Sequence, residues 1–440
     1  MADGSEADKP RIEPIYSQNA PDEPIELRQA AVCLGHQGKE YKGTASAVMR
    51  FLPGDSLEFE VALDEDGSCP AAKLSCAPGS NIRLTLTDTG VGFDAFYAPR
   101  GGRRTENIFS PRRSPVTVTP PTAAISAATF HLFNFPPFVC PEYRVVLKAD
   151  GWIVTIEATD RTDELEQKLK AQGGYVITHM GRIVREGGTA FCSEQLDDLL
   201  ACLRYCLSFT LGCWAGVALP VGFDGNGNRV FERWGMHTVG RGSWNALSSW
   251  FDPQHAELFL QVFPGFVSLW RDAVWHQPLC SAVYWYLEAN SAFGVDTAMI
   301  LAQTALELLA WTYCVQDHKI VSQDAFKPRG GLSASDKVRM LISSLGIPKE
   351  IPPELPVLCG RPGKKWDDGV HAITDIRNSL VHPDSKVPVS VERDEEAHRL
   401  SLWYITMALL RLCGHDGVYA NILTPGRWAG VVERVPWGKG

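Results

Sequence analysis

Two kinds of motif are missing from this chain of 440 residues, and each absence narrows its chemistry. No two of the twelve cysteines form a C-x-x-C pair, so the ligand spacing typical of zinc sites is lacking. There is also no glycine-rich phosphate loop of the G-x-x-x-x-G-K-[ST] type. We therefore expect no metal, no cofactor, and cysteines that stay reduced in the core of a cytoplasmic protein.

The sequence also lacks the patterns of a signal peptide and of a membrane span. The first ten residues, MADGSEADKP, are polar and acidic, which predicts a disordered arm over residues 1–23. The longest apolar stretch, residues 296–314, carries Gln303 and Glu307 at its centre, where a membrane would make both side chains costly. We expect a cytoplasmic protein without membrane contact.

An excess of positive charge is missing as well. The chain has 42 Lys and Arg against 51 Asp and Glu, a net charge of -9, which argues against broad binding of nucleic acid through phosphate neutralisation. Any RNA site must therefore be local. Of two basic stretches, residues 99–105 with 111–115 are expected to be solvated loops. The second stretch, with Arg361, Lys364 and Lys365, stands just before a helical pattern and can guide a substrate.

Period-two alternation of apolar and polar residues marks residues 24–190. Strands are expected at residues 56–63, 81–87, 129–135, 143–148 and 152–157, with a hairpin turn at 149–151 and a short helix at 161–171. This pattern predicts an antiparallel β sandwich or barrel-like domain, used for recognition or sensing. His131, His179 and Asp94 stand alone in it, and we expect them to be ordinary surface or core residues.

Helical patterns follow the β-rich region. Residues 191–277 begin with a helix capped by Ser193 and then become rich in tryptophan, which we expect to pack in a core rather than stack bases, because the neighbours are Leu, Phe and Val. Residues 278–424 predict a bundle with helices at 278–292, 296–316, 335–345, 366–381 and 393–413, before a tail at 425–440. The fold class is α+β multidomain, with an all-α bundle after the β domain.

The strongest clue to chemistry is the string Arg377-Asn378-Ser379-Leu380-Val381-His382-Pro383. On a helix Arg377 falls in the middle of an apolar arc, so its permanent charge needs an acidic partner, a phosphate or a wet cleft. Pro383 disfavours helical geometry at His382, which places the histidine at the helix end with a freer ring. Such a pair can move a proton during 2'-hydroxyl attack in RNA and stabilise the charge on phosphate.

Arg377, Asn378 and His382 in this setting resemble the HEPN superfamily (higher eukaryotes and prokaryotes nucleotide-binding). Its catalytic members carry an arginine, a polar neighbour and a histidine four to six residues on. The likeness covers residues 278–424, and together with the β-rich first half it resembles ApeA-type antiphage HEPN proteins. It implies a metal-independent endoribonuclease in bacterial antiviral defence (abortive infection). A phage-derived or nucleotide trigger would be sensed by the β region.

The resemblance also implies a homodimer, or a higher homo-oligomer, in which two copies of the motif share one RNA-cleaving cleft. A two-fold axis would supply a base and an acid on opposite sides of the phosphate. We expect the dimer interface to include the helix that carries Arg377.

Other interpretations of the motif remain open. Glu307 stands on an apolar helix and can face Arg377, either to orient the arginine in a nuclease or to satisfy its charge in an inactive bundle. In the second case His382 only ends a helix, and the protein is a catalytically inactive HEPN module for assembly or regulation. A HEPN toxin that transfers nucleotides is disfavoured, because it needs an NTP-binding partner and this chain has no phosphate loop.

Overall fold

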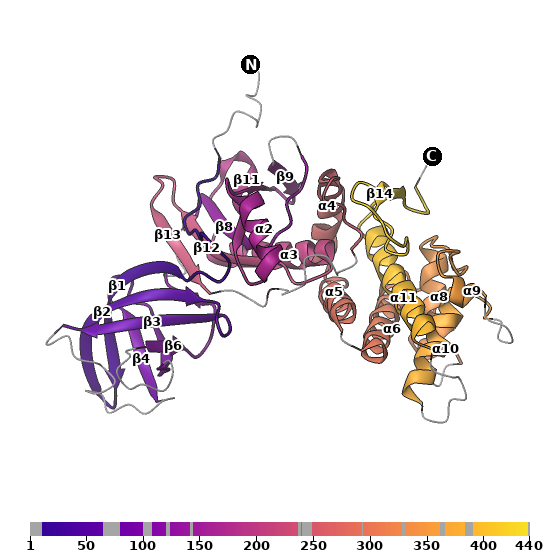
Figure 1. The fold of residues 1–440 in the computed structure, drawn as a ribbon, viewed down its shortest axis with the longest axis horizontal. Helices are drawn as coiled ribbons and strands as arrows, with labels where there is room; N and C mark the ends of the chain where they lie inside the picture. The colour runs from indigo at the N-terminus through magenta and orange to yellow at the C-terminus, as the bar shows by residue number, and fades with distance from the viewer. Residues whose placement is uncertain are drawn as a thin grey trace, which may run out of the picture.

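The structure is a computed structural model that describes residues 11–64, 80–99, 108–119, 124–140, 144–235, 239, 249–292, 294–327, 331–360, 366–382 and 390–438. It has three parts in chain order: a β barrel, a seven-stranded sheet with helices, and a helical region. Figure 1 shows the barrel at one end, the helical region at the other and the sheet between them.

The barrel contains six antiparallel strands, closed in the order β1-β2-β3-β6-β5-β4. Side chains alternate along each strand, as in β4, where Ile82, Leu84 and Leu86 are buried in the interior while Arg83 is exposed. A two-residue turn with Gln37 and Gly38 at positive φ joins the first two strands, as expected for a tight hairpin. The strands are β1 (Ile25–His36), β2 (Lys39–Arg50), β3 (Ser56–Leu63), β4 (Asn81–Leu86), β5 (Gly92–Tyr97) and β6 (Ile108–Pro111).

The second unit is an open antiparallel sheet in the order β7-β13-β12-β8-β11-β10-β9. Gly181 on β11 lies opposite Phe130 on β8, and the phenyl ring covers it so closely that a Cβ would come within 2.0 Å of a ring carbon. The strands are β7 (Val116–Thr117), β8 (Ala127–Phe133), β9 (Arg144–Ala149), β10 (Trp152–Ala158), β11 (Ile177–Arg185), β12 (Gly216–Phe223) and β13 (Arg229–Trp234). Helix α2 (Thr162–Gln172) and helix α3 (Ser193–Leu211) belong to the same unit.

The sheet separates two hydrophobic cores. Side chains on one face, such as Met180, Val221 and Trp234, pack with the interior residues of the barrel. Side chains on the other face, such as Phe130 and Val154, pack with α3 and with the C-terminal helices in a continuous core. The sheet therefore packs against the barrel with one face and against the helical region with the other.

The helical region is built around α6 (Val295–Trp311), which continues as a π-helical turn over Thr312–Asp317 and packs against α5, α8, α10 and α11. The segment Val295–Asp317 is long and apolar enough to pass for a membrane span, but 56% of its most apolar window is buried inside the protein, as in a core helix. The other elements are α4 (Glu257–Arg271), α5 (His276–Ser291), α7 (Gln323–Phe326), α8 (Ala334–Ser344), α9 (Pro356–Cys359), α10 (Gly369–Val381), α11 (Val391–Leu412), β14 (Val418–Tyr419) and β15 (Glu433–Arg434).

Several expectations from the sequence are confirmed. The fold is α+β and multidomain, and the hairpin turn at Asp150 and Gly151, the helix at residues 161–171 and the five C-terminal helices are present within a few residues of their predicted bounds. The tryptophans are core residues: Trp234 and Trp250 are fully buried, and Trp270 and Trp275 nearly so. Trp214 is partly buried, and Trp244 lies outside the described residues.

Other expectations need correction. The β-rich region is not one sandwich, because its strands divide between a closed barrel and a separate sheet. The segment expected to be a helical linker contributes two strands of that sheet, β12 and β13.

Within the predicted disordered arm, residues 11–23 are packed, since Tyr16 is 4% exposed and its amide donates to His131 Nε2 at 3.2 Å. The N-cap of α3 is Cys192 rather than Ser193, because Cys192 keeps extended backbone geometry and its amide donates to the Gln195 side chain at 3.0 Å.

Candidate functional site

Helix α10 carries the Arg377 motif, and both of its ends have clear physical causes. Asp368 caps the first turn by accepting a hydrogen bond from the His371 amide at 2.8 Å. The next residue is a glycine, and a larger residue would not fit here without a shift, because a Cβ would lie 2.5 Å from the Tyr404 hydroxyl oxygen. The helix ends at Val381, and His382 leaves helical geometry with φ -102° and ψ 118° while its amide still donates to the Asn378 carbonyl at 3.0 Å. The expected end of the helix is confirmed, and its start lies three residues later than predicted, at Gly369 instead of residue 366.

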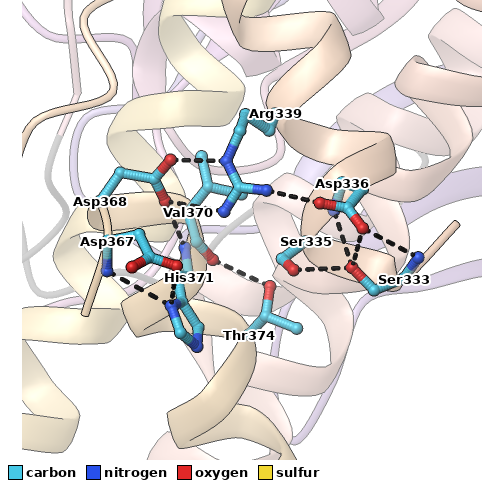
Figure 2. A network of polar contacts seen from close by, with 9 residues as sticks. All are labelled: Ser333, Ser335, Asp336, Arg339, Asp367, Asp368, Val370, His371 and Thr374. Carbon is cyan, nitrogen blue, oxygen red and sulfur yellow. Dashed lines mark hydrogen bonds and ion pairs between the residues drawn. The ribbon is translucent and has the colours of Figure 1, made fainter. Parts of the chain in front are cut away.

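A buried ion pair fixes the beginning of α10 to α8. The Arg339 guanidinium donates from Nε to Asp368 Oδ2 at 2.6 Å and from Nη2 to Asp368 Oδ1 at 3.2 Å, and Nη1 reaches Asp336 Oδ1 at 2.6 Å. Asp336 belongs to the capping box of α8, where Ser333 accepts from the Asp336 amide at 3.1 Å. Figure 2 shows how this chain of contacts connects the two helix starts.

Burial shifts the pKa of Asp368 in one direction, and its hydrogen bonds and charged neighbour shift it in the other. Burial alone raises the pKa of its carboxyl, but the hydrogen bonds from Arg339 and from the His371 amide, with the positive charge of Arg339, lower it more, so the net pKa lies below the ordinary value. Asp368 is therefore ionised in the folded protein at neutral pH. The motif helix is held firmly at the end opposite to Arg377 and His382.

His371 forms a second polar contact at the same end of α10. Its Nδ1 lies 3.2 Å from Asp367 Oδ2 and 3.3 Å from the Asp367 amide nitrogen, and its side chain is about one third exposed (38%). Trp366 donates from Nε1 to Asp375 Oδ2 at 2.9 Å. Neither His371 nor Arg339 is part of the predicted site. Asp368, directly before a helical pattern, is the signal that points to this end of the helix.

Arg377 lies at the other end of α10 and is half-buried. Its Nη1 donates to Asn378 Oδ1 at 3.1 Å, while its Nε is buried and has no hydrogen-bond partner among the residues that the structure describes. Glu307, the proposed partner on α6, instead accepts a hydrogen bond from Gln303 Nε2 at 3.0 Å. Although α6 and α10 pack together, no ion pair joins Glu307 to Arg377 within the described chain.

The remaining predicted site residues divide into two groups. Asn378 and His382 are exposed at the last turn of α10, next to Arg377 in the fold as in the sequence. Arg361, Lys364 and Lys365 lie outside the described residues. Within the described ranges, no group of three or more His, Cys, Asp or Glu side chains is arranged to hold a metal ion.

The three isolated residues of the β-rich half have structural roles, as expected. His131 is fully buried between the Tyr16 amide and the Leu219 carbonyl, and burial lowers its pKa to about 4 although the Leu219 hydrogen bond raises it in part. Burial likewise lowers the pKa of His179 to about 3. Asp94 pairs with Arg83 at 3.1 Å on the barrel surface.

Two family models match this chain. One, the YopA central domain, matches residues 120–245, which contain six of the seven strands of the sheet, all except β7. The other, the YopA C-terminal domain, matches residues 272–433, which contain α5 to α11 and the motif helix. Neither range includes the barrel.

A curated relative is similar to about two thirds of this chain. The SPbeta prophage-derived uncharacterized protein YopA of Bacillus subtilis (strain 168) is 28% identical over 300 residues, which span 67% of this chain and 66% of that protein. No solved structure shows significant similarity. The chain is thus similar to YopA proteins over its central sheet and its helical region.

Proposed function

We propose that this protein is a metal-independent endoribonuclease of the HEPN type, acting in bacterial antiviral defence, with Arg377 and His382 as its working pair. The observation that carries the proposal is the state of Arg377. A half-buried guanidinium whose Nε has no partner among the described residues is costly unless something outside the chain supplies an acceptor. A phosphate of RNA is the acceptor that matches both the charge and the fork geometry of arginine.

The position of His382 suits a proton carrier. It stands at the helix end with an exposed side chain, one turn beyond the arginine, so its ring can approach a phosphate that Arg377 holds. In the reaction, an imidazole takes the proton of the 2'-hydroxyl, the 2'-oxygen attacks phosphorus, and the bond to the 5'-oxygen breaks. The products are a 2',3'-cyclic phosphate and a free 5'-hydroxyl, and Arg377 stabilises the charge on the pentacoordinate phosphorus.

The leaving 5'-oxygen needs a proton from the opposite side of the phosphate. One motif offers a single histidine, so the acid is His382 of a second copy related by a two-fold axis. Asn378, exposed beside Arg377 and bonded to its Nη1, orients the guanidinium and can contact the same phosphate. The firm anchor at Asp368 and Arg339 keeps the helix that carries these side chains in a fixed position.

The defence role extends the proposal beyond chemistry. The relative from Bacillus subtilis is described as prophage-derived. A resident prophage benefits from a protein that cuts RNA when a competing phage enters the cell. The barrel and the sheet would then receive the phage-derived or nucleotide trigger.

The test is RNA cleavage by the purified full-length protein and two matched variants. His382→Ala should abolish cleavage and leave the circular dichroism spectrum unchanged, because the exposed ring makes little packing contact. His371→Ala is the control, since it removes a histidine of the same helix that lies away from the motif. Equal cleavage by wild type and His382→Ala would contradict the proposal.

The second candidate is an inactive HEPN module that only assembles. Val381 and Val391, on either side of the segment that joins α10 to α11, are 39% and 62% exposed, and a dimer through the end of the motif helix would bury them. RNA that remains intact under every condition, together with a stable dimer, would support this candidate over the nuclease.

A further inference from the structure

The outer surface of the barrel carries an aromatic side chain where polar residues are the rule. On β5, Ala95 and Tyr97 are fully buried and point inward, so Phe96 between them points outward. It lies between Asn81 of β4 and Ser110 of β6 in the register of the three strands. We call this surface, formed by Asn81, Arg83, Asp94, Phe96 and Arg112, the Phe96 face.

Arg112 is placed beside the Phe96 ring without a carboxylate partner. Its guanidinium carbon lies 5.9 Å from the ring centroid, its Nε donates to Asn81 Oδ1 at 2.6 Å, and its backbone amide donates to the Asp94 carbonyl at 2.9 Å. The acceptor on Asn81 is a neutral amide. The positive charge of Arg112 is therefore not neutralised by any residue that the structure describes, although its side chain is fixed in place.

The other charged residues add to this positive charge. Arg113, the residue after Arg112 in the chain, is exposed and forms no ion pair with a described acidic residue. Arg83 pairs with Asp94 at 3.1 Å, but the two side chains are 55% and 67% exposed, so solvent weakens the pair. The guanidinium of Arg83 lies close to Gly92, where a Cβ would be 3.0 Å from its Nε and 3.2 Å from its Nη2. The Phe96 face and the residue after it thus carry three arginines and one aspartate, in a chain whose net charge is -9.

We propose that the Phe96 face binds single-stranded nucleic acid, with a base stacked on Phe96 and phosphates held by Arg112 and Arg113. An aromatic ring beside an arginine that has no carboxylate partner suits recognition of bases and backbone together, because every base has a π face and every linkage a negative charge. An acidic peptide would use the arginines alone and leave the ring without a role. The site is separate from Arg377 and does not depend on the nuclease proposal.

The test measures binding of a fluorescein-labelled single-stranded DNA 12-mer to the full-length protein by fluorescence anisotropy. DNA lacks the 2'-hydroxyl, so the probe stays intact even if the protein cleaves RNA, and failure here is distinguishable from failure of the nuclease. The Phe96→Ala variant should bind about 10-fold more weakly, since loss of one base–aromatic stack has about that effect. The Phe96→Trp variant should bind at least as well as wild type, which also reports that the barrel is folded.

The contribution of the arginines is measured by the salt dependence of binding. The double variant Arg112→Gln/Arg113→Gln should reduce the slope of log K against log salt by about 1.4, because each lost phosphate contact to a single strand removes about 0.7. Arg50→Gln is the matched control, since Arg50 lies on β2 of the same barrel and is already paired with Glu58 at 3.1 Å and Glu60 at 2.8 Å. It should leave both affinity and slope unchanged.

Three outcomes would overturn the assignment. They are no binding by wild type, equal binding by wild type and Phe96→Ala, or a glutamate-rich peptide that binds more tightly than the oligonucleotide. The last result would identify an acidic protein partner instead.

Discussion

The contact between Asp368 and Arg339 gives the sharpest test of how the motif helix is held. Asp368→Ala removes two things at once: the N-cap of α10 and the partner of a largely buried guanidinium. Loss of an N-cap destabilises a protein by about 1 kcal/mol. Removing one partner of a buried ion pair costs about 3–5 kcal/mol, and we reduce this to about 2 because Arg339 is 25% exposed and keeps Asp336.

The expected loss for Asp368→Ala is therefore about 3 kcal/mol in the free energy of unfolding of the helical region. Asp368→Asn keeps an acceptor for the His371 amide and should lose about 2 kcal/mol. Asp367→Ala is the neighbouring control: its carboxylate is 81% exposed and, among the described residues, contacts only His371, so the loss should stay below about 0.5 kcal/mol. Urea unfolding followed by circular dichroism and by fluorescence measures all three.

The same pair predicts the sign of a pH effect. The pKa of Asp368 is lower in the folded protein than in the unfolded chain, so its stabilising contribution is present above the unfolded value of about 3.9 and is lost as the pH falls through the folded value. The difference in unfolding free energy between wild type and Asp368→Asn should shrink as the pH is lowered below 4. A stability of Asp368→Ala equal to wild type at pH 7 would refute the reasoning.

Three further predictions follow from other parts of the molecule. RNA cleavage should persist in EDTA and yield 2',3'-cyclic phosphate ends, detected by mass spectrometry; cleavage that stops with chelator and returns with magnesium would contradict the mechanism. The full-length protein should sediment as a dimer in analytical ultracentrifugation at tens of micromolar, and a monomer that still cleaves RNA would exclude a shared site. Gly181→Ala should destabilise the sheet by at least about 1–3 kcal/mol in thermal unfolding, because the new Cβ would meet the Phe130 ring at 2.0 Å.

Local sequence patterns predict the helices well and the sheets only in part. The five C-terminal helices show clear periodicity and caps, such as Ser333 before α8 and Gly414 at positive φ after α11. Strand β12 shows no period-two pattern, because its sequence, GVALPVGF, is apolar throughout, contains Pro220 and lies between β13 and β8 with both faces buried. The closure of the barrel depends on a short pairing of β3 with β6, between residues about 50 positions apart, which no local pattern reveals.

In the candidate site, too, local patterns predict some features and not others. The end of α10 at His382 follows from Pro383, and the half-buried position of Arg377 follows from the helical arc. A helical wheel describes one helix and does not say which neighbour it meets. The wheel therefore does not predict the pair of Arg339 and Asp368, 29 residues apart, and the expected contact between Glu307 and Arg377 is absent among the described residues.

The position of the sheet between two cores has a consequence for shortened versions of this protein. Without the barrel, Met180, Val221 and Trp234 would face water as an apolar surface. A homologue that keeps only the two matched regions needs another cover for that surface, such as a different domain, a second subunit or polar substitutions on those strands. A recombinant fragment beginning near residue 120 should aggregate unless those positions are redesigned.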